Sequence, residues 1–440
     1  MYEIVGKYTK AIITIDELDD TAISQIYEFI NHPLFTNLIV IMPDSHAGKG
    51  AVIGFTMELT NGIIPNVIGV DINCGMYSVN VGKNLYEKLN KKEIDTIIKD
   101  NIPMGEGKSH KKPDKNYIEE AITELICNTN LMNFKLQSTM NAKFGKLYEI
   151  HKFDERSFKE ICSKIGAKSD YIYASIGTLG GGNHFIEISK DSNNDYWITI
   201  HSGSRNFGAR ICEMHQKIAR SKFNSKEQQN IKSEFDEIKK HTKNKQKLSK
   251  IHDLLKKKID PQEHIPTGLH WLEDQDMFNY LLDMIVASNY ASVNRKTIAN
   301  IILDKLELTK IDSIETVHNY LNYDDFIIRK GAISAKLNER LIIPLNNEDG
   351  ILLCEGLGNS EWNYSAPHGA GRIGPRSQFK EKKYSQEALE RMKKLDIYSS
   401  YIPTDETKLS YKDSNIIKTA IDGVTVKIID ILKPTQNIKG

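Results

Sequence analysis

The feature of this sequence that most constrains its fold is the wide spacing of its polar, glycine-containing motifs. Candidate ligand residues run from position 44 to position 440 of a 440-residue chain, and no internal repeat or low-complexity linker divides them. Length alone would allow roughly two or three domains of average size. A site that draws on residues so far apart needs distant loops to converge on one pocket. We therefore expect one α/β catalytic domain over residues 1–440.

Composition narrows the classes of protein to be considered. The formal net charge is +1, so any contact with nucleic acid must come from a local basic patch. No apolar run reaches the roughly 18–20 residues of a membrane span, and the N-terminus does not resemble a signal peptide. The five cysteines are widely scattered: Cys74, Cys127, Cys162, Cys212 and Cys354. Without a disulfide framework, we expect a cytoplasmic protein that does not contact membranes.

The first 80 residues have the pattern of an α/β segment. β-Branched runs predict strands at 12–15 and 38–41, with a helix over 16–31 between them. Residues 66–71 resemble a buried strand that places Asp71 at its C-terminal end, where α/β sheets often carry functional groups. From about 82 to 165 the chain is mainly helical and polar. The remaining expected elements are strand-like segments at 171–176 and 185–189, a strand at 197–201, a buried helix over 277–295 and a β-like run at 425–432.

A lysine-rich segment at 220–260 contains few Gly or Pro residues. Apolar residues recur in it at helical spacing, which predicts a protruding helical hairpin inserted in the domain. This hairpin is either a solvated helix pair or an arm that touches an RNA backbone.

The motif SAPHGAGR, at 365–372, presents a histidine on a loop. Proline removes a backbone donor and glycine destabilises a helix, so the motif cannot lie inside one. His368 is therefore a candidate nucleophile or general base, and Arg372 is a fork for phosphate.

Five residues elsewhere have the chemistry of metal ligands. Asp71 precedes Cys74 by three residues in a turn that contains glycine, and His184, His201 and His318 each lie beside a polar or glycine-rich loop. Each residue alone could be an ordinary buried cysteine or a satisfied polar residue. Together they form a mixed thiolate, imidazole and carboxylate set that could hold two divalent ions with the thiolate bridging.

Phosphate-binding candidates cluster around a second glycine-rich segment, GTLGGGN at 177–183. Its backbone N–H groups can approach a triphosphate closely, and the Asn183 amide can add a donor. Two similar segments do not have the sequence context of a phosphate-binding loop. Residues 105–109 lack the first glycine of a P-loop, and residues 369–374 are preceded by Pro-His instead of a strand and followed by Pro375. Four basic side chains are candidates to bind the anionic phosphate groups: Arg205, Arg372, Arg376 and Lys49.

Taken together, these motifs resemble the RtcB-type RNA ligases, which join RNA 3′-phosphate and 5′-hydroxyl ends. The order is preserved and the match spans nearly the whole chain. The matching segments are MPDSHAGKGAVIGF (42–55), VIGVDINCGM (67–76), GTLGGGNHFIEI (177–188), HSGSRNFG (201–208), VHN (317–319), SAPHGAGR (365–372), YKD (411–413) and KG (439–440).

The resemblance implies a single α/β domain with a central metal and nucleotide pocket, two Mn²⁺ ions, GTP as cofactor, and RNA ends as substrate. His368 would be the nucleophile that is guanylylated. The implied manganese ligands are Asp71, Cys74, His184, His201 and His318. The implied nucleotide-binding residues are Asn183, Glu187, His368, Gly369, Ala370, Gly371, Arg372, Tyr411 and Lys439, with Glu187, Tyr411 and Lys439 at guanine. Arg205, Arg376 and Lys49 would bind RNA or phosphate.

The chain departs from the family pattern at three places, which suggests a shorter, divergent branch. Pro375 replaces a serine, the segment 344–350 has no serine to contact guanine, and 220–260 matches nothing in the family pattern. Two other functions are considered. One is a guanylyltransferase that caps nucleic-acid 3′-phosphate ends without sealing. The other is a metal-dependent phosphoesterase, whose Gly-Asn-His box occurs at 182–184 but whose Gly-Asp partner is absent from the sequence.

Overall fold

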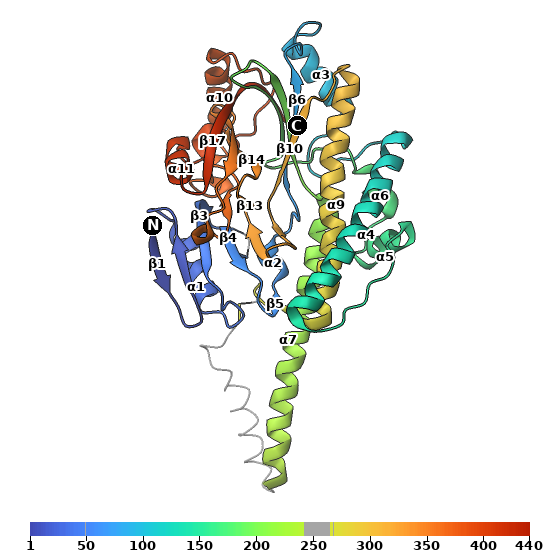
Figure 1. Cartoon of the computed structure of the whole chain (residues 1–440), viewed down its shortest axis with the longest axis vertical. Helices are drawn as coiled ribbons and strands as arrows, with labels where there is room; N and C mark the ends of the chain where they lie inside the picture. The colour runs from blue at the N-terminus through green and yellow to red at the C-terminus, as the bar shows by residue number, and fades with distance from the viewer. Residues whose placement is uncertain (49, 242–264, 267) are drawn as a thin grey trace.

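The computed structural model describes residues 1–48, 50–241, 265–266 and 268–440. Two large sheets stand side by side, with a group of helices against one flank (Figure 1). There are also two small two-stranded sheets, β13 (Ala332–Ser334) with β16 (Ser365–Pro367) and β5 (Gly62–Ile63) with β9 (Leu272–Glu273). The first contacts both large sheets, since β13 lies against β4 (Ile53–Glu58) and β10 (Asp312–Val317). This single mixed domain is the α/β class expected from the sequence.

The N-terminal residues build one edge of a six-stranded sheet. Its order is β1 (Tyr2–Val5), β2 (Lys10–Ile13), β3 (Ile39–His46), β4 (Ile53–Glu58), β12 (Ile327–Lys330) and β11 (Tyr320–Leu321). Only β2 and β3 are parallel, and α1 (Asp20–Ile30) connects them. The two strands and the helix expected here are confirmed. The helix begins later than predicted because the Asp19 side chain accepts a hydrogen bond from the Ala22 N–H and caps it.

The seven-stranded sheet is antiparallel throughout. Its order is β10 (Asp312–Val317), β6 (Gly75–Gly82), β8 (Tyr196–Ser202), β7 (Phe185–Lys190), β17 (Val426–Ile438), β15 (Gly350–Gly356) and β14 (Arg340–Asn346). The edge strands β10 and β14 approach each other, because the Ile342 N–H donates to Thr316 Oγ1 at 3.1 Å. The sheet is therefore close to a barrel. β17 joins its two parts, since its first half pairs with β15 and its second half with β7.

Helix α9 (Asp274–Lys305) packs along β6 and β8 and against α4 and α7, and most of its side chains are buried. This confirms the expected core helix. The other helices are α2 (Pro65–Ile68), α3 (Lys91–Asn101), α4 (Lys115–Phe144), α5 (Glu155–Lys164), α6 (Ser169–Ala174), α7 (Arg205–His241), α10 (Lys382–Lys394) and α11 (Ser414–Ile421), with 3-10 turns at Ser360–Trp362, Arg376–Phe379 and Lys408–Ser410.

Two sequence-based expectations are wrong. Residues 66–71 do not form a strand, because Pro65 fixes a helical φ at the first position of α2 and the chain then turns through Asp71. Residues 171–176 are not strand-like either, since α6 covers most of them. The buried strand of this region is β6, which begins at Gly75, directly after Cys74, and does not precede Cys74 as expected.

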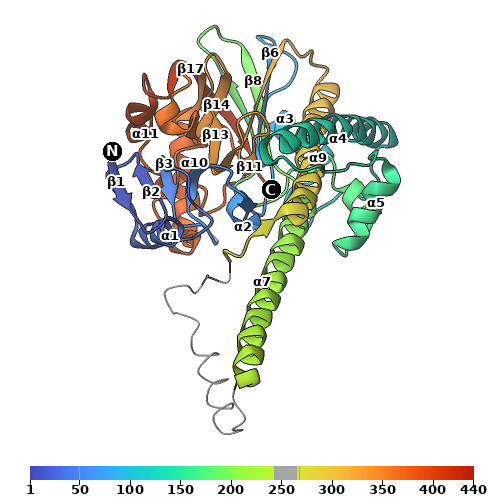
Figure 2. The same cartoon turned by 60° about the horizontal axis from the view of Figure 1, so that its bottom comes forward.

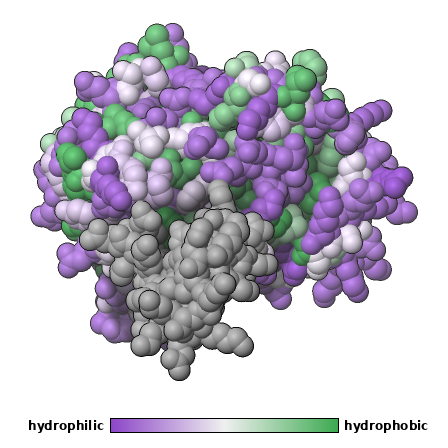
Figure 3. Space-filling view, turned by 90° about the horizontal axis from the view of Figure 1, so that it is seen from below, coloured by the Kyte–Doolittle hydropathy of each residue, from purple (hydrophilic) through white to green (hydrophobic). Residues whose placement is uncertain are grey.

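The lysine-rich segment is only partly described. Its first part is helical, because α7 continues to His241 and projects beyond the rest of the molecule (Figures 1 and 2). Positions 242–264, which hold the second half of the expected hairpin, lie outside the described residues. Polar residues cover most of the face seen in Figure 3, and apolar ones form separate small patches there. No helix in the described part of the chain is long and apolar enough to cross a membrane.

Candidate active site

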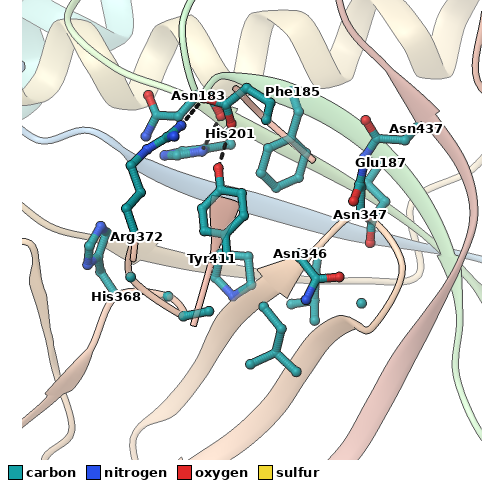
Figure 4. A pocket seen from close by; sticks show the side chains of 18 of the residues that line it. Asn183, Phe185, Glu187, His201, Asn346, Asn347, His368, Arg372, Tyr411 and Asn437 are labelled. Atoms are coloured by element: carbon teal, nitrogen blue, oxygen red, sulfur yellow. Dashed lines mark hydrogen bonds and ion pairs between the residues drawn. The ribbon is translucent and has the colours of Figure 1, made fainter. Parts of the chain in front are cut away.

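Two neighbouring cavities meet at the loop that carries His368. We call the first the inner cavity, and it measures about 110 Å³. Glu187 and Tyr411 line it (Figure 4), and so do Glu406 and Lys439. The second, the outer cavity, measures about 820 Å³ and is lined by residues that include Asp71, Cys74, His318 and Arg376. The residues that line both are His46, Asn183, His368 and Arg372.

Strand register brings the five expected metal ligands together. In the seven-stranded sheet, Gly75 pairs with Val317 on one side and Ser202 on the other, while His201 pairs with Phe185. The neighbours of these residues along the chain are Cys74, His184 and His318, so the ends of β10, β6, β8 and β7 place three imidazoles around one thiol. Asp71 joins them through a tight turn, in which the Cys74 N–H donates to the Asp71 carbonyl at 3.2 Å.

The donor atoms form two groups of three that share Cys74. In one, Asp71, Cys74 and His184 offer ligand atoms within 4.8 Å of one another, and in the other Cys74, His201 and His318 do so. Cys74 Sγ lies 3.4 Å from His184 Nε2 and 3.3 Å from His201 Nε2. A thiolate at the common corner of two such groups suits two divalent ions with a bridging sulfur. The donor set therefore fits the two-ion site predicted from the sequence.

Backbone carbonyls of the 177–183 loop orient two of these histidines. His184 Nδ1 lies 2.9 Å from the Leu179 carbonyl oxygen, and His201 Nδ1 lies 3.1 Å from that of Asn183. A carbonyl oxygen only accepts, so each Nδ1 carries a proton and each Nε2 faces Cys74. The loop predicted to bind phosphate thus orients two of the candidate metal ligands. Its Gly180, at φ +90°, runs so close to Arg205 that a Cβ there would lie 1.6 Å from Nη1.

Burial keeps the imidazoles in the form that binds metal. It lowers the pKa of both His201 and His318 well below the usual value, so both rings are neutral. Burial also opposes ionisation of Asp71, but the hydrogen bond and charge of His184 hold its pKa below the usual value. The pKa of Cys74 is raised well above normal by burial and by Asp71. Binding of a cation would displace the Cys74 proton.

His368 is positioned by a residue of the six-stranded sheet. It follows β16, and its Nδ1 lies 2.6 Å from Oδ2 of Asp44, a fully buried carboxylate on β3. The His368 backbone N–H also donates to that oxygen at 3.2 Å. Its ring packs against His318 with centroids 4.7 Å apart, next to the metal ligands. Gly371 is required behind it, because at φ +73° a Cβ would meet the Asp44 carbonyl oxygen at 2.0 Å.

The inner cavity contains two buried glutamates. The first, Glu187 on β7, accepts hydrogen bonds from Ser189 Oγ at 2.7 Å and Asn437 Nδ2 at 3.2 Å. Burial raises its pKa to about 7, against the pull of these donors and of Lys439. Every residue expected to bind the nucleotide lines this cavity: Asn183, Glu187, His368, Gly369, Ala370, Gly371, Arg372, Tyr411 and Lys439.

The second glutamate, Glu406, was missed by the sequence analysis. Its carboxylate is 2 % exposed and pairs with Arg372, with Arg376 Nη1 at 2.9 Å and with Lys439 Nζ at 3.1 Å. The Tyr411 hydroxyl donates to it at 2.5 Å. Two arginines expected as free anion forks are therefore already paired. An acidic residue five positions before Tyr411 was the available signal, but nothing local indicates its partners.

The other phosphate candidates differ from one another. Arg205 lies against the metal ligands, with Nη1 3.4 Å from His184 Nδ1. Arg376 keeps its place on the outer cavity although Pro375 precedes it, because Pro375 simply begins the 3-10 turn Arg376–Phe379. Lys49 lies outside the described residues. Asp44 and His46, which the sequence analysis left without a role, both lie at the site.

Comparison with known proteins agrees with this architecture. A family model described as tRNA-splicing ligase RtcB matches residues 25–440. The chain belongs to the RtcB family. Among its curated relatives, the RNA-splicing ligase RtcB of Escherichia coli K12 is 26 % identical, over 99 % of this chain and 97 % of its own length. The tRNA-splicing ligase RtcB of Aeropyrum pernix is 23 % identical, over 91 % of this chain and 88 % of its own. The family match includes every residue named above at the two cavities.

Proposed function

We propose that this RtcB family member is a GTP- and Mn²⁺-dependent RNA ligase. It would join RNA 3′-phosphate or 2′,3′-cyclic phosphate ends to 5′-hydroxyl ends through a covalent histidine–GMP intermediate, in RNA repair or tRNA splicing. The observation that carries the proposal is the position of His368. It lies between two cavities. One holds the buried Glu187 carboxylate, which could accept hydrogen bonds from guanine, and the other is lined by candidate metal ligands. Family membership supports the same chemistry.

Asp44 prepares His368 for nucleophilic attack. The Asp44 carboxylate lies 2.6 Å from Nδ1, although not in hydrogen-bond geometry, and its charge favours the tautomer with the proton on Nδ1. In that tautomer the Nε2 lone pair is free. In the proposed first step, Nε2 forms a bond to the α-phosphorus of GTP and pyrophosphate leaves. An RNA 3′-phosphate oxygen then takes the GMP from His368. Finally, the RNA 5′-hydroxyl oxygen attacks the activated 3′-phosphate and GMP leaves.

Cys74, Asp71, His184, His201 and His318 would hold the manganese ions. Bound there, Mn²⁺ would offset the charge of phosphate groups and help to orient the in-line attack. Arg205, which lies beside His184, and Arg376, which lines the outer cavity, would bind phosphate groups of the RNA or nucleotide.

Glu187 is the proposed reader of guanine. Guanine differs from adenine by offering N1–H and a 2-amino group, which a carboxylate can accept together. A buried site of this kind can discriminate by up to about 10⁴-fold. The segment 344–350, which has no serine to contact guanine, supplies Pro344, Leu345, Asn346, Asn347 and Gly350 to the lining of the same cavity. Asn347 Oδ1 is buried without a hydrogen-bond partner among the described residues. Asn347 is therefore available to bind the base in place of a serine.

The first test is labelling of the protein with α-³²P-GTP and Mn²⁺ in the absence of RNA. We expect a labelled protein band that is labile in acid and stable in alkali, as a phosphoramidate is, and no band with His368→Ala. His151→Ala, which changes an exposed histidine outside both cavities, should label like wild type. No label on metal-loaded wild type would contradict the ligase and favour a phosphoesterase. A sealed RNA product separates the ligase from a guanylyltransferase that only caps ends.

A further inference from the structure

His46 has a position and a chemistry that the steps above do not use. It ends β3, two residues beyond Asp44, and lines both the inner and the outer cavity. It is close enough to His368 for the two rings to influence each other electrostatically. A side chain on the common wall of the two cavities can reach a group that reacts between them.

The hydrogen bonding of His46 fixes which nitrogen is basic. Nδ1 lies 3.0 Å from the Asp44 carbonyl oxygen, which can only accept, so Nδ1 carries the proton. In the neutral ring, Nε2 then has a free lone pair. No residue in the described ranges of the chain forms a hydrogen bond with His46 Nε2. His46 therefore presents an unprotonated, unpartnered nitrogen at the site.

His46 is neutral at pH 7 in the unliganded protein. Burial lowers its pKa to about 4, and the nearby His368 and Lys412 also lower it, while Asp44 opposes them. Phosphate groups in the adjoining cavities would bring negative charge and move this pKa upward, toward the range where a base is most effective. The ring is thus able to accept a proton when RNA and nucleotide are bound.

The proposed reaction needs a base at one step in particular. His368 already has a free Nε2 for the first step, and an RNA 3′-phosphate oxygen is already ionised for the second. The 5′-hydroxyl is different, because an alcohol is as weak an acid as water and must lose its proton to attack. A base is therefore required when the two RNA ends are sealed.

We propose that His46 is the general base of the sealing step and that its Nε2 takes the proton of the RNA 5′-hydroxyl. The oxygen forms a bond to the phosphorus of the activated 3′-phosphate, the bond from that phosphorus to the GMP oxygen breaks, and GMP leaves. The proton remains on His46 until solvent accepts it. This inference rests on the proposed function, and it adds a catalytic residue to it.

The test uses the full-length protein with Mn²⁺ and divides the reaction into its parts. One assay measures labelling of His368 by GTP, and a second measures sealing of an RNA already carrying the 3′-guanylylated phosphate to a 5′-hydroxyl RNA. We expect His46→Asn, whose amide can still donate to the Asp44 carbonyl, to label normally and to seal about 10²–10⁴-fold more slowly. In complete reactions, activated RNA should accumulate.

Chemical rescue provides a second, independent measurement. His46→Ala leaves space beside the open outer cavity, and added imidazole should restore part of its sealing rate, because imidazole replaces the missing base. Imidazole should not accelerate wild type or His151→Ala. Sealing by His46→Asn at the wild-type rate would overturn the inference. Loss of GTP labelling in both His46 variants would also overturn it, since it would place His46 in the nucleotide step.

Failure of the proposed function gives a different result from failure of this inference. If wild-type protein neither takes up label from GTP nor seals activated RNA, the ligase itself is wrong. If wild type does both and the His46 variants match it, only the role of His46 is wrong.

Discussion

The metal centre and the inner cavity lie on either side of His368, yet their polar groups are prepared in opposite ways. The candidate metal donors converge and, in the described part of the chain, none forms a salt bridge with a lysine or arginine. One thiol, three imidazoles and one carboxylate face one another, and backbone carbonyls hold two of the rings. In the inner cavity the charged groups are already paired, because Glu406 contacts two arginines, Lys439 and Tyr411.

This difference indicates two modes of binding. A cation can enter the metal centre without displacing a charged side chain, so that site is preorganised. An anionic nucleotide entering the inner cavity meets cations that Glu406 already neutralises, so binding requires an exchange of partners. Charge repulsion between Glu406 and a phosphate group would accompany that exchange. Selectivity for the cation can thus arise from the arrangement of the donor atoms. Selectivity for the nucleotide can arise from competition between its phosphate groups and Glu406 for the same cations.

The largest loss of activity should come from removing the Cys74 sulfur, which both groups of three candidate metal ligands share. Cys74→Ser keeps the size of the side chain but replaces a thiolate with a hydroxyl, a much poorer ligand for a bridging position. We expect GTP labelling to fall at least about 10³-fold. The rise in melting temperature on addition of Mn²⁺ should disappear, because that rise depends on binding to the folded state.

Cys354→Ala is a matched control, since Cys354 is equally buried but lies on β15 among apolar residues. It should lower the melting temperature through lost packing yet keep the Mn²⁺-dependent rise. If Cys74→Ser kept both the Mn²⁺-dependent rise in melting temperature and the GTP labelling, the conclusion that these donors form a preorganised cation site would be wrong.

A smaller effect should follow from neutralising the centre of the paired network. Glu406→Gln leaves the buried Arg372 and Lys439 without their carboxylate, while the exposed Arg376 keeps its pairing with Asp405. We expect the free energy of unfolding to fall by about 3 kcal/mol. GTP should then raise the melting temperature of the variant more than that of wild type, because its phosphates replace the missing anion. Glu348→Gln is the control: Glu348 is also a buried partner of an arginine, but it lies outside the inner cavity. Equal GTP-induced shifts in Glu406→Gln and wild type would rule out the exchange of partners.

The smallest effect should be a change in the pH dependence of stability at Glu187. Its pKa is about 7 in the folded protein and close to 4.5 when exposed, so between these values the folded state binds more protons than the unfolded state. The unfolding free energy of wild type should therefore fall as pH rises from about 4.5 to 7. Glu187→Gln should lack this decline and be more stable than wild type by about 2 kcal/mol at pH 8, measured by urea unfolding. Parallel pH profiles would mean that Glu187 is not desolvated.

The sequence predicted elements and site residues better than it predicted pairings. β-Branched runs identified β2 and β3, and the apolar run identified α9, because burial on a fixed period leaves a local pattern. The motif residues of both cavities were identified because their glycines and polar side chains are unusual in any local context. The error at 66–71 was also local, since Pro65 starts a helix where the apolar residues resemble a strand.

Contacts between distant residues left no such pattern. Asp44 and His368 are 324 positions apart, and Glu406 is 33 positions from Lys439. Whether an arginine is free or paired depends on which carboxylate the fold brings to it. For this reason the residue types at the site could be predicted, while the pairing of Arg372 and Arg376 with Glu406 could not.

The position of β17 has a consequence for how the molecule is made. This strand joins β7 to β15 in the seven-stranded sheet, and it follows every other strand that the structure describes. During synthesis, the metal-binding strands and the strands beside His368 emerge from the ribosome long before the strand that fastens them together. Pairings across so many residues form slowly, because a long loop must close first. The two half-sites therefore gain a fixed geometry relative to each other only after β17 has been made, and a chain truncated before β17 would have both half-sites without that geometry.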